Sequence, residues 1–267
     1  MLERMGEFFD RRLEGYESHQ LECIAGAREF YPYTAGLLPM QPGAEVLDLG
    51  CGTGLELEAF FEMNPQARVT GIDLAQGMLE RLRSKHPDKR LKLICGSYFT
   101  EEFGLNAFDA AVSVESLHHF TKEEKIPLYA KVYGALKKKG CFVLTDYFAL
   151  TEEEEIFHRH ELERLKKEQG IEDQEFYHYD TPLTVEHEME ALKAAGFASV
   201  LMLIIKEAEQ KKTCADGFFE KIEIPSVNYT KYELSTNQAK AFFLGIYKDL
   251  PALRRGRAYP HPEDPPS

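Results

Sequence analysis

The chain has 267 residues, of which 43% are hydrophobic, 29% are charged and 12% are aromatic. This balance is typical of a globular protein and excludes a disordered or fibrous chain. With 32 basic against 45 acidic residues, the formal net charge is −13. Because a surface this acidic repels phosphate backbones, we do not expect a nucleic-acid partner.

Neither a membrane span nor a secretory signal is predicted. The longest aliphatic run, Val200 to Ile205, is far shorter than the roughly 20 residues that cross a bilayer. The first residues lack a basic stretch leading into an apolar one. The five cysteines are odd in number and form no CxxC pair. This pattern favours reduced thiols in a cytoplasmic protein, and we expect a monomer or homodimer.

Strand-like and helix-like segments alternate between residues 44 and 205. Short apolar runs predict strands over 45–49, 68–72, 91–95, 107–114 and 140–145, and helical periodicity predicts helices over 55–62, 77–85 and 122–136. The last of these helices is expected to end at a Lys-Lys-Lys-Gly turn. A helix over 182–195, closed by Gly196, and a strand over 199–205 follow. Repeated strand–helix units predict a doubly wound α/β fold with a mostly parallel sheet.

Three segments fall outside this alternation. Residues 1–40 predict an N-terminal helical cover, and residues 151–181 form an insert within the α/β domain over 41–206. Both are rich in aromatic residues, which either cover the carboxyl edge of the sheet, where ligands bind, or only pack onto the core. Residues 207–267 form an extension, with a last edge strand expected over 241–247 and a disordered tail.

A glycine-rich loop follows the first predicted strand. The segment Val46-Leu47-Asp48-Leu49-Gly50-Cys51-Gly52-Thr53-Gly54 lets the backbone turn sharply and approach an anionic group at the start of the next helix. The GxGxxG fingerprint of dinucleotide-binding proteins would need glycine at position 55, which is Leu55. Asp73 ends the second strand, where a carboxylate can accept both hydroxyl hydrogens of a ribose. Loop and acid together predict a nucleoside site.

These motifs resemble those of the class I S-adenosylmethionine-dependent methyltransferases, especially the small-molecule type. The resemblance implies that S-adenosylmethionine is the cofactor and that a small molecule accepts its methyl group. It places the methionine end at the glycine loop, the ribose at Asp73 with Leu74, and the adenine near Ser97 and Tyr98. The full set of expected cofactor-binding residues is Asp48, Gly50, Gly52, Gly54, Asp73, Leu74, Met78, Ser97, Tyr98, Ser113, Val114 and Tyr16.

The segment from Ser113 to Phe120 resembles the one that such enzymes place beside the sulfonium. We take Glu115, His118 and His119 as candidate catalytic residues, because a base is needed when the acceptor is a hydroxyl or a protonated amine. The alternative is that the two histidines only cap a helix or contact the cofactor. His158 and His160 diverge on a helix, and no other group has ligand spacing, so no metal is expected.

Two other functions remain open from the sequence. The insert also resembles that of the carboxy-S-adenosylmethionine synthases and their relatives in tRNA modification, which modify the cofactor itself. Those enzymes need a basic group near the methyl group, and no clear arginine is found among the matched positions. The third hypothesis is a non-catalytic cofactor-binding sensor or a subunit of a larger assembly.

Overall fold

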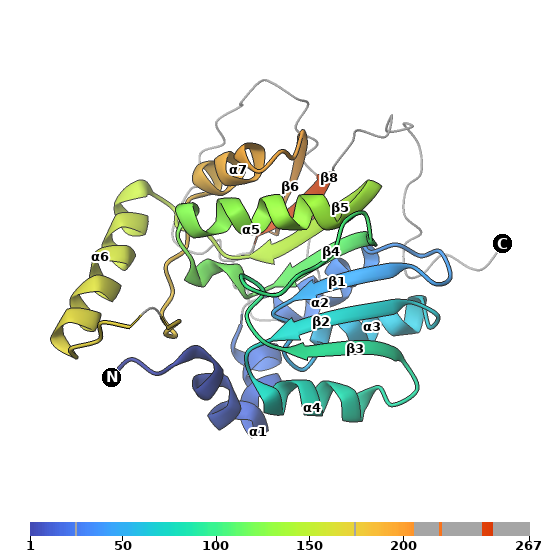
Figure 1. Ribbon diagram of the computed structural model, residues 1–267, viewed down its shortest axis with the longest axis horizontal. Helices are drawn as coiled ribbons and strands as arrows, with labels where there is room; N and C mark the ends of the chain where they lie inside the picture. The colour runs from blue at the N-terminus through green and yellow to red at the C-terminus, as the bar shows by residue number, and fades with distance from the viewer. Residues whose placement is uncertain (25, 174, 206–218, 221–241, 248–267) are drawn as a thin grey trace.

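Five parallel strands form the centre of the protein. The computed structural model describes residues 1–24, 26–173, 175–205, 219–220 and 242–247 (Figure 1). The parallel strands are β1 (Glu45–Leu49), β2 (Arg68–Asp73), β3 (Arg90–Cys95), β4 (Phe108–Val114) and β5 (Leu136–Asp146). Their order is β3-β2-β1-β4-β5. From β1 the chain first adds β2 and β3 on one side and then β4 and β5 on the other, as in a doubly wound α/β fold. This confirms the expected fold class.

Helices cover both faces of this sheet. Neighbouring residues of β1 point to opposite sides: Val46 belongs to the cluster that contains Phe60 of α3, and Leu47 to the cluster that contains Leu128 of α5. Helices α2 (Ala27–Gly36), α3 (Leu55–Met63) and α4 (Gln76–Lys85) contribute to the first cluster, and α5 (Lys122–Ala135) and α7 (Val185–Ala194) to the second. The alternation explains why the central strands are apolar on both faces.

Antiparallel strands extend the sheet beyond β5. Strand β8 (Phe242–Tyr247) pairs with β5 on one side and with β6 (Ser199–Ile205) on the other, and β6 pairs with the short β7 (Phe219–Glu220). The last strand was expected at an edge, which is wrong, because β8 inserts between two earlier strands. The rest of the predicted extension over 207–267 lies outside the described residues.

Two predicted boundaries differ from the structure. Helix α7 begins at Val185 rather than at residue 182, because the Thr184 hydroxyl caps it by accepting the His187 backbone N–H at 3.3 Å. The Lys-Lys-Lys-Gly segment is not a turn between helix and strand. Pairing of β5 with β4 shifts between Leu136 and Cys141, so the lysines form a bulge within β5.

The N-terminal segment and the insert meet at the carboxyl ends of the parallel strands. Helices α1 (Met5–Cys23) and α6 (Glu152–Glu168) lie on the side to which the strand arrowheads point (Figure 1). The Met5 backbone N–H donates to the Phe176 carbonyl at 2.9 Å, and the His178 N–H donates to the Glu3 carbonyl at 3.0 Å. None of the described helices combines the length and apolar composition that a bilayer crossing requires.

Candidate active site

Glycines shape the loop between β1 and α3. Gly50, Gly52 and Gly54 have φ of 75°, 47° and 72°. A Cβ on Gly50 would lie 2.1 Å from the Ser116 hydroxyl oxygen, and one on Gly54 would lie 2.5 Å from a methyl carbon of Leu82. These two glycines are therefore required by close packing. A Cβ on Gly52 would meet only Tyr16, in ordinary contact, with the Tyr16 hydroxyl oxygen 3.6 Å away.

Asp73 fixes the glycine loop against the end of β2. Its two carboxylate oxygens accept the backbone N–H groups of Gly52 and Ala75, each at 2.8 Å. Each oxygen keeps a second lone pair, so the carboxylate can still accept hydrogen bonds from a ligand. The acid expected from the sequence thus orients the loop as well as facing the site.

A pocket lies between the strand ends and helix α1. About 490 Å³ of space free of protein atoms lies there, part of it open to solvent. Seven of the expected cofactor-binding residues line it: Gly50, Gly52, Asp73, Leu74, Met78, Tyr98 and Tyr16. Glu115 and His119, two of the three candidate catalytic residues, also line it. The remaining walls are Met5 and Phe9 of α1 and Ser116.

Other expected cofactor-binding residues serve the scaffold and do not line this pocket. The Ser97 hydroxyl accepts the Phe99 N–H at 3.2 Å in a local turn, and its expected contact with an adenine stays a prediction. The Ser113 hydroxyl is buried and donates to the Leu49 carbonyl at 2.9 Å, which ties β4 to β1. Val114 packs into the core on the α3 side, and Gly54 contacts α4.

Asp48 lies buried near the pocket beside Glu56 of α3. Burial raises the pKa of Asp48 well above its usual range, and the neighbouring Glu56 carboxyl raises it further. Burial also raises the pKa of Glu56. The two side chains also share a hydrogen bond, which raises the pKa of Asp48 and lowers that of Glu56, so the pair holds a proton between its oxygens. A buried acidic pair of this kind is suited to a cationic group from a ligand, which would take the place of the shared proton.

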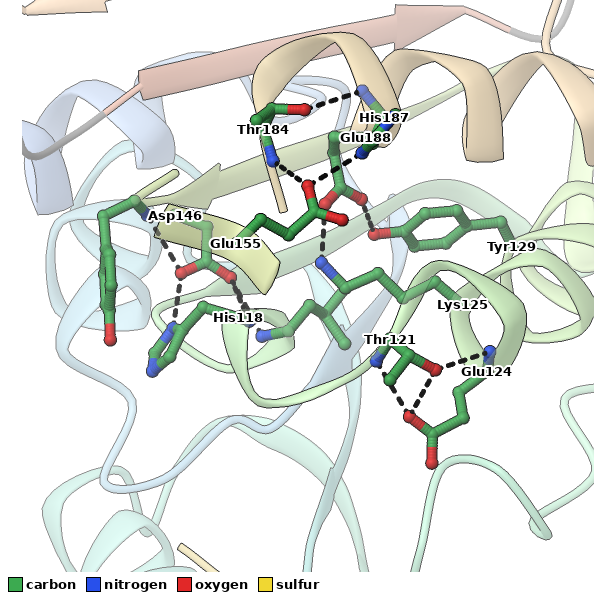
Figure 2. A network of polar contacts seen from close by, with 12 residues as sticks. His118, Thr121, Glu124, Lys125, Tyr129, Asp146, Glu155, Thr184, His187 and Glu188 are labelled. Atoms are coloured by element: carbon green, nitrogen blue, oxygen red, sulfur yellow. Dashed lines mark hydrogen bonds and ion pairs between the residues drawn. The ribbon is translucent and has the colours of Figure 1, made fainter. Parts of the chain in front are cut away.

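His118 is held by two carboxylates. Its Nδ1 lies 2.6 Å from Asp146 Oδ1, and the other Asp146 oxygen accepts the backbone N–H groups of Leu117 and His118 (Figure 2). Its Nε2 lies 3.5 Å from Asp180 Oδ1. Burial acts to lower the pKa of His118, but the two carboxylates outweigh it and raise the pKa to about 10. His118 is therefore protonated at neutral pH and unsuited to act as a base.

His119 and Glu115 have the opposite electrostatic character. Burial and the charge of His118 lower the pKa of His119, so its imidazole is neutral at pH 7. Its Nδ1 lies 3.1 Å from the Tyr179 carbonyl oxygen and 3.3 Å from Asp180 Oδ1. Burial raises the pKa of Glu115 to about 8, with the Asp146 charge acting in the same direction. Glu115 also has a φ of 51°, which turns the chain at the end of β4.

Several residues of the site were missed by sequence reasoning. Asp146 ends β5 and Asp180 follows the insert, and nothing in the spacing of either relates it to the two histidines. Their signal is topological, because Asp146 ends a parallel strand at the same edge as Asp73. For Met5 and Phe9 of the N-terminal cover, the only signal in the sequence was an apolar pattern, which does not distinguish a pocket wall from the core. The three-residue group His118, His119 and Asp180 also shows that ligand-forming side chains can converge without recognisable spacing.

Comparisons with known proteins agree with this geometry. Residues 46–140 match the family described as a methyltransferase domain. The chain is 31% identical over 140 residues to 24-methylenesterol C-methyltransferase 2 of Arabidopsis thaliana, which covers 51% of this chain and 37% of that protein. It is 26% identical over 175 residues to carboxy-S-adenosyl-L-methionine synthase of Actinobacillus pleuropneumoniae, covering 59% and 70%. The chain thus spans little more than a third of the length of the plant relative.

A solved structure shows the same fold. A Thermotoga maritima protein, titled a SAM-dependent methyltransferase and possible histamine N-methyltransferase, superposes with a TM-score of 0.58 at 16% identity, covering 92% of this chain and 100% of that one. At this identity the likeness is one of fold.

Proposed function

The chain carries a class I S-adenosylmethionine-dependent methyltransferase domain, and we propose from this premise that it transfers a methyl group to a small-molecule acceptor. The observation that carries the proposal is the convergence of the glycine loop, Asp73 and Glu115 on one pocket. In the proposed pose, the ribose hydroxyls donate to Asp73, and the methionine ammonium lies near Asp48 and Glu56. The methyl group then points toward Glu115.

Methyl transfer is an in-line displacement. A lone pair of the acceptor forms a bond to the methyl carbon, the carbon–sulfur bond breaks, and its electron pair stays on sulfur. The donor loses its positive charge and becomes S-adenosylhomocysteine. Because both reactants must be held in line and away from water, positioning supplies most of the rate enhancement. Met5, Phe9 and Tyr16 of α1 line the pocket and exclude water from it.

Glu115 is the residue we assign as general base. A base works best when its pKa lies near the working pH, and burial places the pKa of Glu115 at about 8. For a hydroxyl acceptor, the proton passes to the Glu115 carboxylate as the oxygen attacks the methyl carbon. His119 lies beside this position and orients the acceptor, while His118 is held between Asp146 and Asp180.

Cofactor binding tests the proposal directly. Calorimetry with S-adenosylmethionine is expected to show one site per chain. Asp73→Ala should weaken binding at least about tenfold, because two charge-assisted hydrogen bonds to the ribose are lost. Asp88→Ala, at an exposed position after α4, is the matched control and should bind like the unchanged chain. Equal affinities in all three proteins would remove the proposed pose.

Carboxy-S-adenosylmethionine synthesis is the second candidate, because that synthase is among the relatives. Such a reaction needs a cationic side chain to hold a second carboxylate. Among the described residues that line the pocket, none is lysine or arginine. This favours methyl transfer over carboxylation of the cofactor. Mass spectrometry of the ligand that co-purifies separates the two, since the carboxylated cofactor is heavier.

A non-catalytic sensor or subunit would keep the cofactor site without turnover. It predicts no product with any acceptor and a stable complex with another protein in cell extracts, which a pull-down followed by an acceptor screen would show. We favour an enzyme because two ionisable side chains, Glu115 and His119, line the pocket where an acceptor would lie. A cytoplasmic location is also proposed, because the five cysteines are odd in number and form no CxxC pair.

A further inference from the structure

We propose that His118, His119 and Asp180 bind one divalent transition-metal ion at the edge of the cofactor pocket. This inference rests on the proposed function for its role in the reaction, but the site itself is assigned from geometry. The three side chains come from the turn after β4 and from the end of the insert. One possible ligand atom from each lies within 4.8 Å of the others. Two imidazoles and one carboxylate suit Zn²⁺, Co²⁺ or Fe²⁺.

Two distances within the group are long for hydrogen bonds and compatible with shared coordination. Asp180 Oδ1 lies 3.5 Å from His118 Nε2 and 3.3 Å from His119 Nδ1. A charge-assisted N–H···O bond is shorter, at about 2.7–2.9 Å. Two ligand atoms that each lie about 2.0–2.1 Å from a tetrahedral ion are about 3.3 Å apart. These two distances are compatible with an ion between Asp180 and the imidazoles, and on binding it His119 Nδ1 would exchange its contact with the Tyr179 carbonyl oxygen, at 3.1 Å, for the ion.

A second carboxylate orients the first histidine. Asp146 contacts His118 Nδ1 at 2.6 Å, and its own position is fixed by two backbone N–H groups. Figure 2 shows the second ring nitrogen of His118 directed away from Asp146. A carboxylate behind a ligating histidine is the usual support of a metal site, because it fixes the ring and strengthens the ligand. An ion displaces the hydrogen that otherwise occupies His118 Nε2.

The site has an entrance and faces the place of reaction. The Asp180 side chain is 46% exposed, so an ion can enter from solvent, whereas the His118 and His119 side chains are buried. His119 also lines the cofactor pocket. Three protein ligands leave at least one position open on the ion. An acceptor with a hydroxyl or carboxylate oxygen would take this position. The proposed methyl acceptor is thereby narrowed to small molecules that carry such an oxygen.

Titration with Co²⁺ tests the site without any activity measurement. The full chain is treated with a chelator, and Co²⁺ binding is followed by visible absorption and by calorimetry at one fixed pH. We expect one ion per chain. Asp180→Asn and His119→Gln should each weaken binding at least about tenfold, and Asp146→Asn should weaken it about 10–100-fold as a positioning residue.

Matched controls separate this site from adventitious binding. His160→Gln and Asp88→Asn make the same chemical changes at exposed positions and should leave Co²⁺ affinity unchanged. Circular dichroism of the metal-free variants checks that each is folded. Should His119→Gln be unfolded, the test rests on the more conservative variant, Asp180→Asn. Absence of stoichiometric binding, or equal binding by Asp180→Asn and the controls, would overturn the metal site. Calorimetry with S-adenosylmethionine on the same preparations reports independently on the proposed function.

Discussion

At the scale of single residues, the buried pair of Asp48 and Glu56 is expected to lose a proton when the cofactor binds. Burial raises the pKa of both carboxyl groups, so in the free protein the pair keeps a proton to a higher pH than ordinary carboxyl groups do. An ammonium group placed beside them favours the ionised carboxylates and releases protons. Affinity for S-adenosylmethionine should therefore rise with pH through the range in which the pair ionises, below the usual pKa of an α-amino group near 7.7.

Calorimetry in two buffers of different ionisation enthalpy measures the released protons. The unchanged chain should release a fraction of a proton or more per bound cofactor. Asp48→Asn removes one titrating group, so it should bind the cofactor more weakly and release fewer protons. A binding enthalpy that is the same in both buffers at pH 7 would contradict this assignment of the ammonium.

Glu115 carries a separate prediction about turnover. Glu115→Gln keeps the size of the side chain and its ability to hydrogen-bond but cannot accept a proton. We expect the turnover number to fall about 10²-fold or more while cofactor affinity changes little. The comparison uses single-turnover rates with the acceptor found by screening. A fall in cofactor affinity with unchanged turnover would instead make Glu115 a binding residue.

Residues of the site were predictable where the chemistry is local in the chain. Gly50, Gly52 and Asp73 were found because a strand, a loop of alternating glycines and a second strand occur in succession. Asp180 was not, because it comes near His119 only through the path of the insert. The adenine contact expected for Ser97 stays a prediction, and the Phe99 N–H that its hydroxyl accepts would compete with such a ligand.

At the scale of elements, buried polar contacts join the helices on one face of the sheet. Lys125 of α5 pairs with Glu188 of α7 at 2.5 Å, and their side chains are 2% and 0% exposed. Tyr129 donates to the same carboxylate (Figure 2). Glu155, the only buried residue of α6, accepts the Thr184 N–H at the start of α7 at 2.7 Å. Helix α6 is thus held to α7 by polar contacts, while Phe176, farther along the insert, packs against Phe99 and Phe120.

Breaking the buried ion pair should destabilise the protein strongly. Lys125→Met leaves the Glu188 charge without its partner and should lower the free energy of unfolding by about 3–5 kcal/mol. The double change Lys125→Met with Glu188→Gln removes that charge and should recover part of the loss. Lys122→Met breaks the Lys122–Glu190 pair between the same helices, but at partly exposed positions.

Urea unfolding followed by circular dichroism compares these variants. The exposed pair should be worth about 1 kcal/mol or less, because water screens it. If Lys125→Met and Lys122→Met lost the same stability, burial would not be the reason for the strength of the inner pair.

Elements were predicted best where the periodicity is strong. The five parallel strands lie within two residues of their expected starts, apart from β5, whose three lysines read as a turn. They form a bulge because Leu136 already pairs with Phe108, before the second pairing begins at Cys141. The start of α7 was set too early because proline favours the first helical turn, whereas Thr184 supplies the cap two residues later.

At the scale of the whole molecule, the last described strand of the chain, β8, lies inside the sheet rather than at its edge. Strand β8 pairs along β5 from Cys141–Tyr247 to Asp146–Phe242, and along β6 from Ser199–Tyr247 to Ile204–Phe242. Local sequence could not reveal this, since an apolar strand at the end of a chain is equally suited to an edge. The pairing closes only when the last strand has joined, as expected for contacts distant in sequence.

Removal of β8 should therefore damage the fold more than its length suggests. A chain ending at residue 241 leaves one side of β5 and one side of β6 unpaired, and exposed strand edges promote aggregation. We expect it to elute as aggregates in size-exclusion chromatography and to lack a cooperative thermal transition. A chain ending at Tyr247 keeps all the pairs of β8 and is the matched control. If both truncated chains unfolded at the same temperature with equal cooperativity, β8 would contribute nothing to closing the sheet, and β5 would be a stable edge on its own.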